Sequence, residues 1–269
     1  IFVGGSNLIF GLRAGPLSRR IGAPVVNYGL HAGIGIDVIA ARASDLIGPG
    51  DLVVLATEAL HDPLAQFHSP LRAKFLNYVA GKRPLYSLAL ARKSCASLRQ
   101  TLHNRVMSLN RHRPSSANEP TSVYSLEAIG LDGSLYFPRP VAGNLFVSRI
   151  TGGWTDADLA RSTATRALEL LREKCRQRRA TLAVMPPFRL AAPGADLSLL
   201  LECERRWLAL AGERGAIQLL GPGESLLEPH FGFDSEYHLN DAGVAIMETR
   251  LAGALTSVLA GPESGASIP

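Results

Sequence analysis

Two short segments near opposite ends of the chain carry side chains that would form a nucleophilic site if they met. Ser6 follows two glycines, and His238 follows two acids, Asp234 and Glu236. A serine hydroxyl is a weak nucleophile until a base takes its proton, and histidine most often serves as that base. We therefore expect Ser6 as nucleophile and His238 as base, with Asp234 or Glu236 holding the second imidazole nitrogen.

Each of these residues also has a purely structural interpretation. Ser6 suits a helix N-cap, and His238 suits a hydrogen-bonded loop. The four-residue steps from His230 to Asp234 to His238 would suit metal ligands only on a continuous helix. Gly232 and the neighbouring aromatic residues disfavour such a helix, so we expect neither a metal nor a cofactor.

The elements that must position the two segments read as an α/β protein. Apolar runs predict five buried strands, at Ile1–Val3, Pro24–Tyr28, Asp51–Ala56, Thr181–Met185 and Ala216–Leu220. Helical patterns lie between several of them, over 17–21, 34–47, 155–179 and 196–214, and a further helix follows Asn240 to about 259. Strands that alternate with helices predict a three-layer α/β/α sandwich around a mainly five-stranded parallel sheet.

The carboxyl ends of parallel strands share one edge of a sheet, and ligands of open α/β sheets bind there. Ser6 comes directly after the first predicted strand, and the His238 segment comes after the last one. The fold class therefore predicts that the two chain ends meet at this edge. In the predicted 155–179 helix, Thr155 and Asp158 have capping-box spacing.

The strand and helix pattern lapses over 63–151, and we interpret this stretch as an insertion in a single domain of residues 1–260, followed by a flexible tail over 261–269. Asp132-Gly133 predicts a short hairpin inside it. From 63 to 118 there are ten basic residues and no acid. This composition favours an anionic membrane surface or a polyanion as partner, or simply a solvated basic face. No recognition motif for nucleic acid accompanies it, so none is expected as a partner.

Taken together, these residues resemble the SGNH/GDSL hydrolase superfamily. The likeness rests on Ser6 in its glycine-rich turn, on Asn27-Tyr28-Gly29 after the second strand, and on the segment Asp-x-x-x-His-Leu-Asn-x-x-Gly that ends in Gly243. It covers about 1–60 and 180–255 and is closest to the extracytoplasmic bacterial branch of alginate O-acetylation and cell-wall D-alanine transfer.

The resemblance implies a flavodoxin-like fold and acyl-ester chemistry. By this likeness Ser6 attacks, His238 is the base and Asp234 orients it. The backbone amides of Ser6 and Gly29 would lie near the oxyanion, with Ala32 or Gly33 as a looser match. The implied activity is that of a cofactor-independent esterase or O-acetyltransferase acting on a surface or secreted glycan.

The chain departs from the family pattern at two positions. The superfamily places its acid three residues before the histidine, whereas Asp234 is four residues before His238. Its third oxyanion donor is an asparagine after the third strand, and here that place reads Thr57-Glu58-Ala59. Removal of one such donor typically slows turnover by ~10²–10³-fold.

Several arrangements would fit that missing asparagine. Asn7, Asn27 or Thr57 substitutes for it, the enzyme is slow, or the site binds acyl groups without turning them over. Glu58 is a further candidate beside the oxyanion, or an ordinary acid at the start of a helix. The alternative function is then a weak or inactive accessory protein that binds glycan or an anionic surface.

Two further features concern the compartment. The chain begins at Ile1, already inside a predicted strand, so we expect an upstream segment, either a signal peptide or a membrane anchor. No run of eighteen uninterrupted apolar residues occurs, so no membrane span is expected. Cys95, Cys175 and Cys203 fit no zinc spacing and are expected to be small buried side chains.

Overall fold

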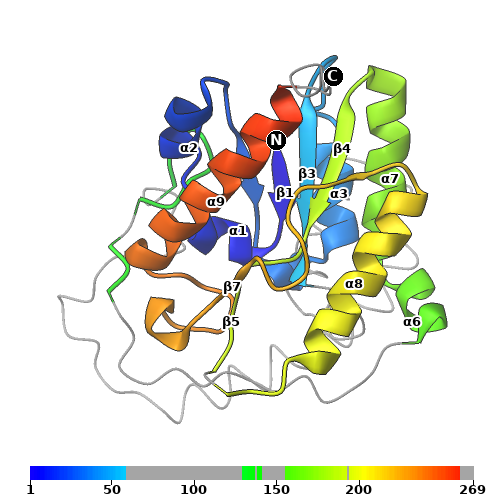
Figure 1. The fold of residues 1–269 in the computed structure, drawn as a ribbon. Coiled ribbons are helices and arrows are strands. Elements are labelled where there is room, and N and C mark those ends of the chain that lie inside the picture. Colours follow the sequence, from blue (N-terminus) through cyan, green and yellow to red (C-terminus); the bar gives the residue numbers. More distant parts are fainter. Residues whose placement is uncertain (59–128, 137, 141–154, 193, 261–269) are drawn as a thin grey trace, which may run out of the picture.

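The computed structural model describes residues 1–58, 129–136, 138–140, 155–192 and 194–260, which fold around a five-stranded parallel sheet (Figure 1). The strands are β1 (Phe2–Gly4), β2 (Asn27–Gly29), β3 (Leu52–Ala56), β4 (Thr181–Met185) and β6 (Ile217–Gln218). They lie in the order β2-β1-β3-β4-β6, with all neighbours parallel. The five-stranded parallel sheet predicted from the sequence is confirmed, and its order is that of a flavodoxin-like doubly wound fold.

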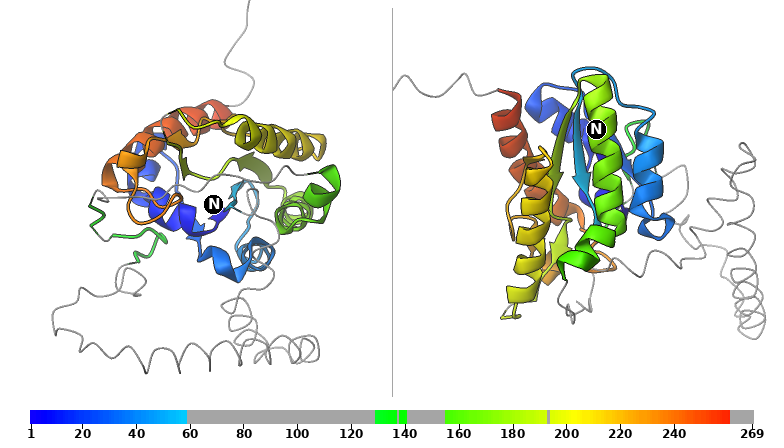
Figure 2. Two further views of the ribbon diagram at one scale, coloured as in Figure 1. Left: turned by 90° about the horizontal axis from the view of Figure 1, so that it is seen from below. Right: turned by 90° about the vertical axis from the view of Figure 1, so that its right-hand side faces the viewer.

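Helices cover both faces of this sheet, as the three-layer prediction requires. On one side lie α3 (Ile36–Ala43) and α7 (Thr163–Arg178), and on the other lie α1 (Ser6–Gly11), α2 (Ala14–Ile21) and α9 (Asp241–Leu259), as Figure 2 shows. The long helix α8 (Ser198–Glu213) contacts β4 and β6. A small second sheet pairs β5 (Arg189–Leu190) with β7 (Leu226–Leu227) in parallel, and is followed by the 3₁₀ turn η6 (Pro229–Phe231).

The core divides into two layers because successive side chains of a strand point to opposite faces. Along β3, Val53 and Leu55 pack toward α3 and α7, whereas Val54 and Ala56 pack toward α2 and α9. Buried strands in such a sheet are apolar on both faces, which is why they appear as continuous apolar runs in the sequence. Cys175 and Cys203, as expected, are buried free thiols, while Cys95 lies outside the described residues.

Two predicted helices are interrupted in the structure. The prediction of one helix over 155–179 is wrong. Helix α6 (Asp156–Arg161) is followed by Ser162, whose extended backbone interrupts the helix. The Ser162 hydroxyl then caps α7 by accepting the Thr165 amide hydrogen. The capping box of Thr155 and Asp158 is present at the start of α6. The pattern over 34–47 likewise divides into a 3₁₀ turn, η1 (Ala32–Ile34), and α3, because Gly35 adopts φ 94° between them.

The described part of the predicted insertion packs against the edge strand β2. Ile129 and Leu135 form an antiparallel bridge around a turn in which Gly133 has φ 80°. The turn is held to the sheet because Asn27 donates its amide hydrogen to the Asp132 carbonyl at 2.9 Å. Ala14 at the start of α2 donates to Ser134 Oγ at 2.6 Å. The remainder of the insertion, including the whole basic stretch 63–118, and the tail 261–269 lie outside the described residues.

Among the described helices, α9 is long and apolar enough to cross a membrane by length and composition. It is not a run of eighteen uninterrupted apolar residues, because polar residues interrupt it. About a third of it is buried in the fold. That face carries Val244, Met247, Leu251 and Leu255 into the core. Core helices of folded domains can have the same length and composition, and the buried face of α9 is that of a core helix.

Gly133→Ala tests whether the 129–136 turn fastens the sheet edge. A Cβ at Gly133 would lie 1.8 Å from the Asn27 carbonyl oxygen, whereas a Cβ at Gly22, which also has a positive φ, meets nothing within 4 Å. Gly22→Ala should therefore show only the left-handed strain of about 1–2 kcal/mol. Gly133→Ala should lower the free energy of unfolding by on the order of 3 kcal/mol or more in denaturant titrations. Equal losses in the two variants would contradict the contact.

Candidate active site

The structure brings Ser6 and His238, 232 residues apart in the sequence, into one hydrogen-bonded chain with Asp234. His238 Nε2 lies 2.9 Å from Ser6 Oγ. His238 Nδ1 lies 2.5 Å from Asp234 Oδ1. The other candidate acid, Glu236, forms an ion pair with Arg189 at 3.2 Å. Asp234 is therefore the acid at the histidine, although it stands four residues before it.

Ser6 is held in place by a close approach of the chain to the end of β3. A Cβ at Gly4 would lie 2.1 Å from the Ala56 carbonyl oxygen, and one at Gly5 would lie 2.0 Å from Glu58 Oε2. Neither glycine has a positive φ. The two glycines are thus required by the space between β1 and β3, and not by a left-handed turn. β1 and β3 are the neighbouring strands at which the strand order of the sheet reverses, which is the switch point of a doubly wound fold.

The loop that carries His238 is fixed by its own hydrogen bonds and by a ring contact. The Phe233 amide donates to the His238 carbonyl at 2.8 Å. Asn240 caps α9 by accepting the Gly243 amide at 3.0 Å. The imidazole stacks on the Phe10 ring, with centroids 3.9 Å apart and planes 17° from parallel. Its rotation is therefore restricted on one face, while both nitrogens stay engaged in the plane.

Phe10 and Arg139 were not identified by the sequence analysis. Phe10 reads as an ordinary apolar residue of a short helix. Arg139 is buried and donates to the Phe10 carbonyl at 2.9 Å and to Asp241 Oδ1 at 3.1 Å. It thereby ties the end of α1, which carries Ser6, to the start of α9, which follows the histidine loop. No local signal marks this role, because its partners lie about a hundred residues away in both directions.

Three of the predicted oxyanion donors, Gly29, Gly33 and Asn27, are already engaged. The Gly29 amide donates to Asn27 Oδ1 at 2.9 Å, and the Gly33 amide donates to His31 Nδ1 at 3.0 Å. Asn27 Nδ2 donates to the carbonyls of Leu8 and Leu12 at 2.9 and 3.0 Å. Asn27 is therefore a buried tie between β2 and α1, with no amide hydrogen left for a ligand.

The remaining predicted donors differ in what they offer. The Ser6 amide makes no hydrogen bond with the part of the chain that is described. The Asn7 amide donates to Glu58 Oε1 at 2.7 Å. The side-chain amide of Asn7 is fully buried and has no partner within the described ranges. Thr57 is buried beside Glu58, and Ala32 begins η1.

Glu58 is the second polar side chain that contacts the serine hydroxyl. Its Oε1 lies 3.4 Å from Ser6 Oγ, and its Oε2 is buried without a hydrogen-bond partner among the described residues. Burial raises the pKa of the Glu58 carboxyl above its usual 4.5, and the Asn7 amide hydrogen bond only partly offsets this effect. His31 also belongs to this electrostatic environment, since burial and the neighbouring His238 lower the pKa of its imidazole.

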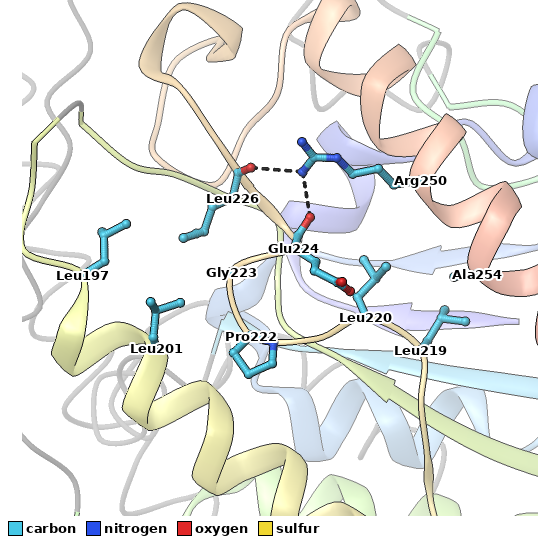
Figure 3. Close-up of a pocket in the computed structure, with 10 residues that line it drawn as sticks. All are labelled: Leu197, Leu201, Leu219, Leu220, Pro222, Gly223, Glu224, Leu226, Arg250 and Ala254. Atoms are coloured by element: carbon cyan, nitrogen blue, oxygen red, sulfur yellow. Dashed lines mark hydrogen bonds between the residues drawn. The ribbon is translucent and has the colours of Figure 1, made fainter.

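A separate cavity of about 860 Å³ lies beyond the carboxyl end of β6, between α8 and α9 (Figure 3). Five of its ten lining residues are leucines, and it contains none of the residues around Ser6. Its two charged side chains are engaged locally: Arg250 donates to the carbonyls of Glu224 and Leu226, and Glu224 accepts the Gly221 amide. The chemistry of the described residues is therefore concentrated at Ser6.

Within the described ranges, no group of three or more His, Cys, Asp or Glu is placed to hold a metal ion. Comparisons of the chain with protein-family models, with curated proteins and with solved structures give no significant match. The chemical interpretation of the site therefore rests on its own geometry.

Asp234→Ala tests the pairing at the histidine. A proton held between imidazole Nδ1 and a carboxylate at 2.5 Å should give a strongly deshielded proton NMR resonance. Asp234→Ala should remove this resonance because it removes the acceptor. Glu236→Gln is the matched control: it alters the Arg189 pair and should leave the resonance in place. If the resonance disappears in Glu236→Gln but persists in Asp234→Ala, then Glu236 and not Asp234 pairs with the histidine.

Proposed function

We propose that this protein is a serine hydrolase of the SGNH/GDSL type, acting as an esterase or O-acyltransferase. The observation that carries the proposal is the hydrogen-bonded chain from Ser6 Oγ through His238 to Asp234. A serine in this setting has a base within reach of its proton and an acid that fixes the imidazole tautomer. All three side chains occupy the ligand-binding edge of a doubly wound sheet.

In the proposed reaction, Ser6 Oγ attacks the carbonyl carbon of an ester while its proton passes to His238 Nε2. The carbonyl electron pair moves to oxygen to form the tetrahedral oxyanion. Collapse expels the alcohol, which takes the proton back from His238, and leaves an acyl group on Ser6. Water, or a sugar hydroxyl, then attacks the acyl-serine with the same proton transfers in reverse order. Asp234 stabilises the charged imidazole in each half of the cycle.

The substrate class follows from the family resemblance and not from the site itself. The resemblance suggests that the substrate carries acyl groups on a surface or secreted glycan, and that the protein is extracytoplasmic. The basic stretch 63–118, which would favour an anionic surface, lies outside the described residues. Water and a sugar hydroxyl are equivalent acceptors in this chemistry, so hydrolysis and transfer share one proposal.

A non-enzymatic accessory protein on the same fold is the second candidate. It is favoured by the engagement of the Gly29 and Asn7 amides, which reduces the number of donors for an oxyanion. Such a protein would bind an acylated ligand at the same edge of the sheet without forming an acyl-serine.

Covalent labelling with a fluorophosphonate separates the two candidates. The reagent should modify Ser6, because the hydroxyl is activated by His238, and peptide mass spectrometry should locate the adduct on the segment that contains Ser6. Ser6→Ala and His238→Ala should both abolish labelling. Hydrolysis of a chromogenic acetyl ester should be lost in the same two variants.

Ser18→Ala provides the matched control. Ser18 lies in α2, and its hydroxyl donates to the Ala23 carbonyl just after that helix at 2.7 Å. This variant should label as the wild type does. Absence of labelling and of ester hydrolysis in the folded wild-type protein would contradict the enzyme and favour the accessory protein.

A further inference from the structure

We propose that Glu58 acts as a neutral carboxylic acid in this site and donates a hydrogen bond to the acyl oxygen as that oxygen becomes negative. This inference rests on the proposed function and adds a catalytic residue to it. Among the described side chains, His238 and Glu58 are the two that hydrogen bond to Ser6 Oγ, at 2.9 and 3.4 Å.

The first reason is the single hydrogen of the serine hydroxyl. His238 Nε2 must accept that hydrogen if the imidazole is to act as base. An ionised Glu58 has only acceptor oxygens and would compete for the same hydrogen. A neutral Glu58 with its proton on Oε1 instead donates toward Ser6 Oγ, and a remaining lone pair still accepts the Asn7 amide. Every contact around Ser6 then pairs a donor with an acceptor.

The second reason is the surroundings of the carboxyl group. Glu58 is only 7% exposed, and its Oε2 has no hydrogen-bond partner within the described residues. Within the described part of the chain, no arginine or lysine forms an ion pair or a hydrogen bond with it. Burial disfavours the charged carboxylate more than the backbone amides of Asn7 and Glu58 and the nearby His238 favour it, so the group remains protonated. The upward shift in the pKa of Glu58 agrees with this geometry.

The third reason is the need for a donor at this point. The acyl oxygen is two bonds away from Ser6 Oγ in the tetrahedral intermediate. The backbone amides of Asn7 and Gly29 are engaged elsewhere, which leaves the Ser6 amide and the Asn7 side-chain amide as donors besides Glu58. A neutral acid kept protonated by an apolar site is an effective oxyanion donor in other enzymes. An ionised carboxylate in the same position would instead repel the developing charge. Protonation of Glu58 should therefore decide whether Ser6 reacts.

The protonation state is tested without reference to activity. An unfolded chain ionises Glu58 near the usual pKa of 4.5, while the folded protein keeps it neutral to higher pH. Raising the pH above about 4.5 should therefore destabilise the wild type relative to Glu58→Gln, which has no proton to lose. The titratable groups around the site, His238, Asp234 and His31, are the same in both proteins, so the comparison isolates the change at Glu58. A difference in Tm that is independent of pH would overturn the neutral acid.

The catalytic role is tested by the rate at which the fluorophosphonate labels Ser6, since its phosphoryl oxygen occupies the place of the acyl oxygen. Glu58→Ala should slow labelling by about 10²–10³-fold, the usual effect of a lost oxyanion donor. Glu58→Gln stays neutral and keeps an acceptor for the Asn7 amide, so it should be slowed less. The rate of the wild type relative to Glu58→Gln should fall at the pH at which the Tm difference shows Glu58 to ionise.

These outcomes separate the two proposals. The donor role is overturned, while Ser6 remains the nucleophile, if Glu58→Ala is labelled at the normal rate. It is also overturned if the labelling rate of the wild type relative to Glu58→Gln does not change at the pH at which Glu58 ionises. A folded wild type that the reagent never labels overturns the proposed function and the donor role together, whereas the Tm comparison still reports whether Glu58 is neutral.

Discussion

The proposed chemistry of this protein depends on the hydrogen bond between Ser6 and His238. This hydrogen bond joins the turn after β1 to the loop before α9, and the sheet holds these two segments at a fixed separation. Each flanking contact serves the same geometry: the stacked Phe10 ring limits the imidazole, and Arg139 fastens α1 to α9. A shift of about 1 Å in either helix would separate nucleophile and base, which is sufficient to impair such a site.

The edge at which these residues meet is also where the sheet reverses its winding. Ser6 follows β1 and Glu58 follows the neighbouring strand β3, so both residues lie at this edge of the sheet. Gly5 allows their close approach, because a Cβ there would lie 2.0 Å from Glu58 Oε2. A polar carboxyl, a hydroxyl and an imidazole thereby share a space from which water is largely excluded. In such a space the charge of each group depends strongly on the others.

The parallel sheet, its five strands and the nucleophile and base candidates could be predicted from the sequence because each depends on local patterns. Apolar runs marked the strands, and the placement of Ser6 and His238 after the first and last strands followed from strand ends sharing an edge. The residue pattern alone left Asp234 and Glu236 open, and the family resemblance indicated Asp234. The ion pair between Glu236 and Arg189 could not be seen in the sequence, because the two residues are far apart in it. The break at Ser162 was missed because helical periodicity continues across it. The engagement of Asn27 and Gly29 likewise became visible only when α1 and β2 were packed together.

The order of the site along the chain has a consequence for biosynthesis. The serine emerges from the ribosome near the beginning of the described sequence, whereas its base and the helix that anchors the base emerge more than two hundred residues later. A nascent or truncated polypeptide that ends before α9 therefore carries an inert hydroxyl. Reactivity at Ser6 would then report that translation has passed α9 and that the segments carrying Ser6 and His238 have both docked on the sheet.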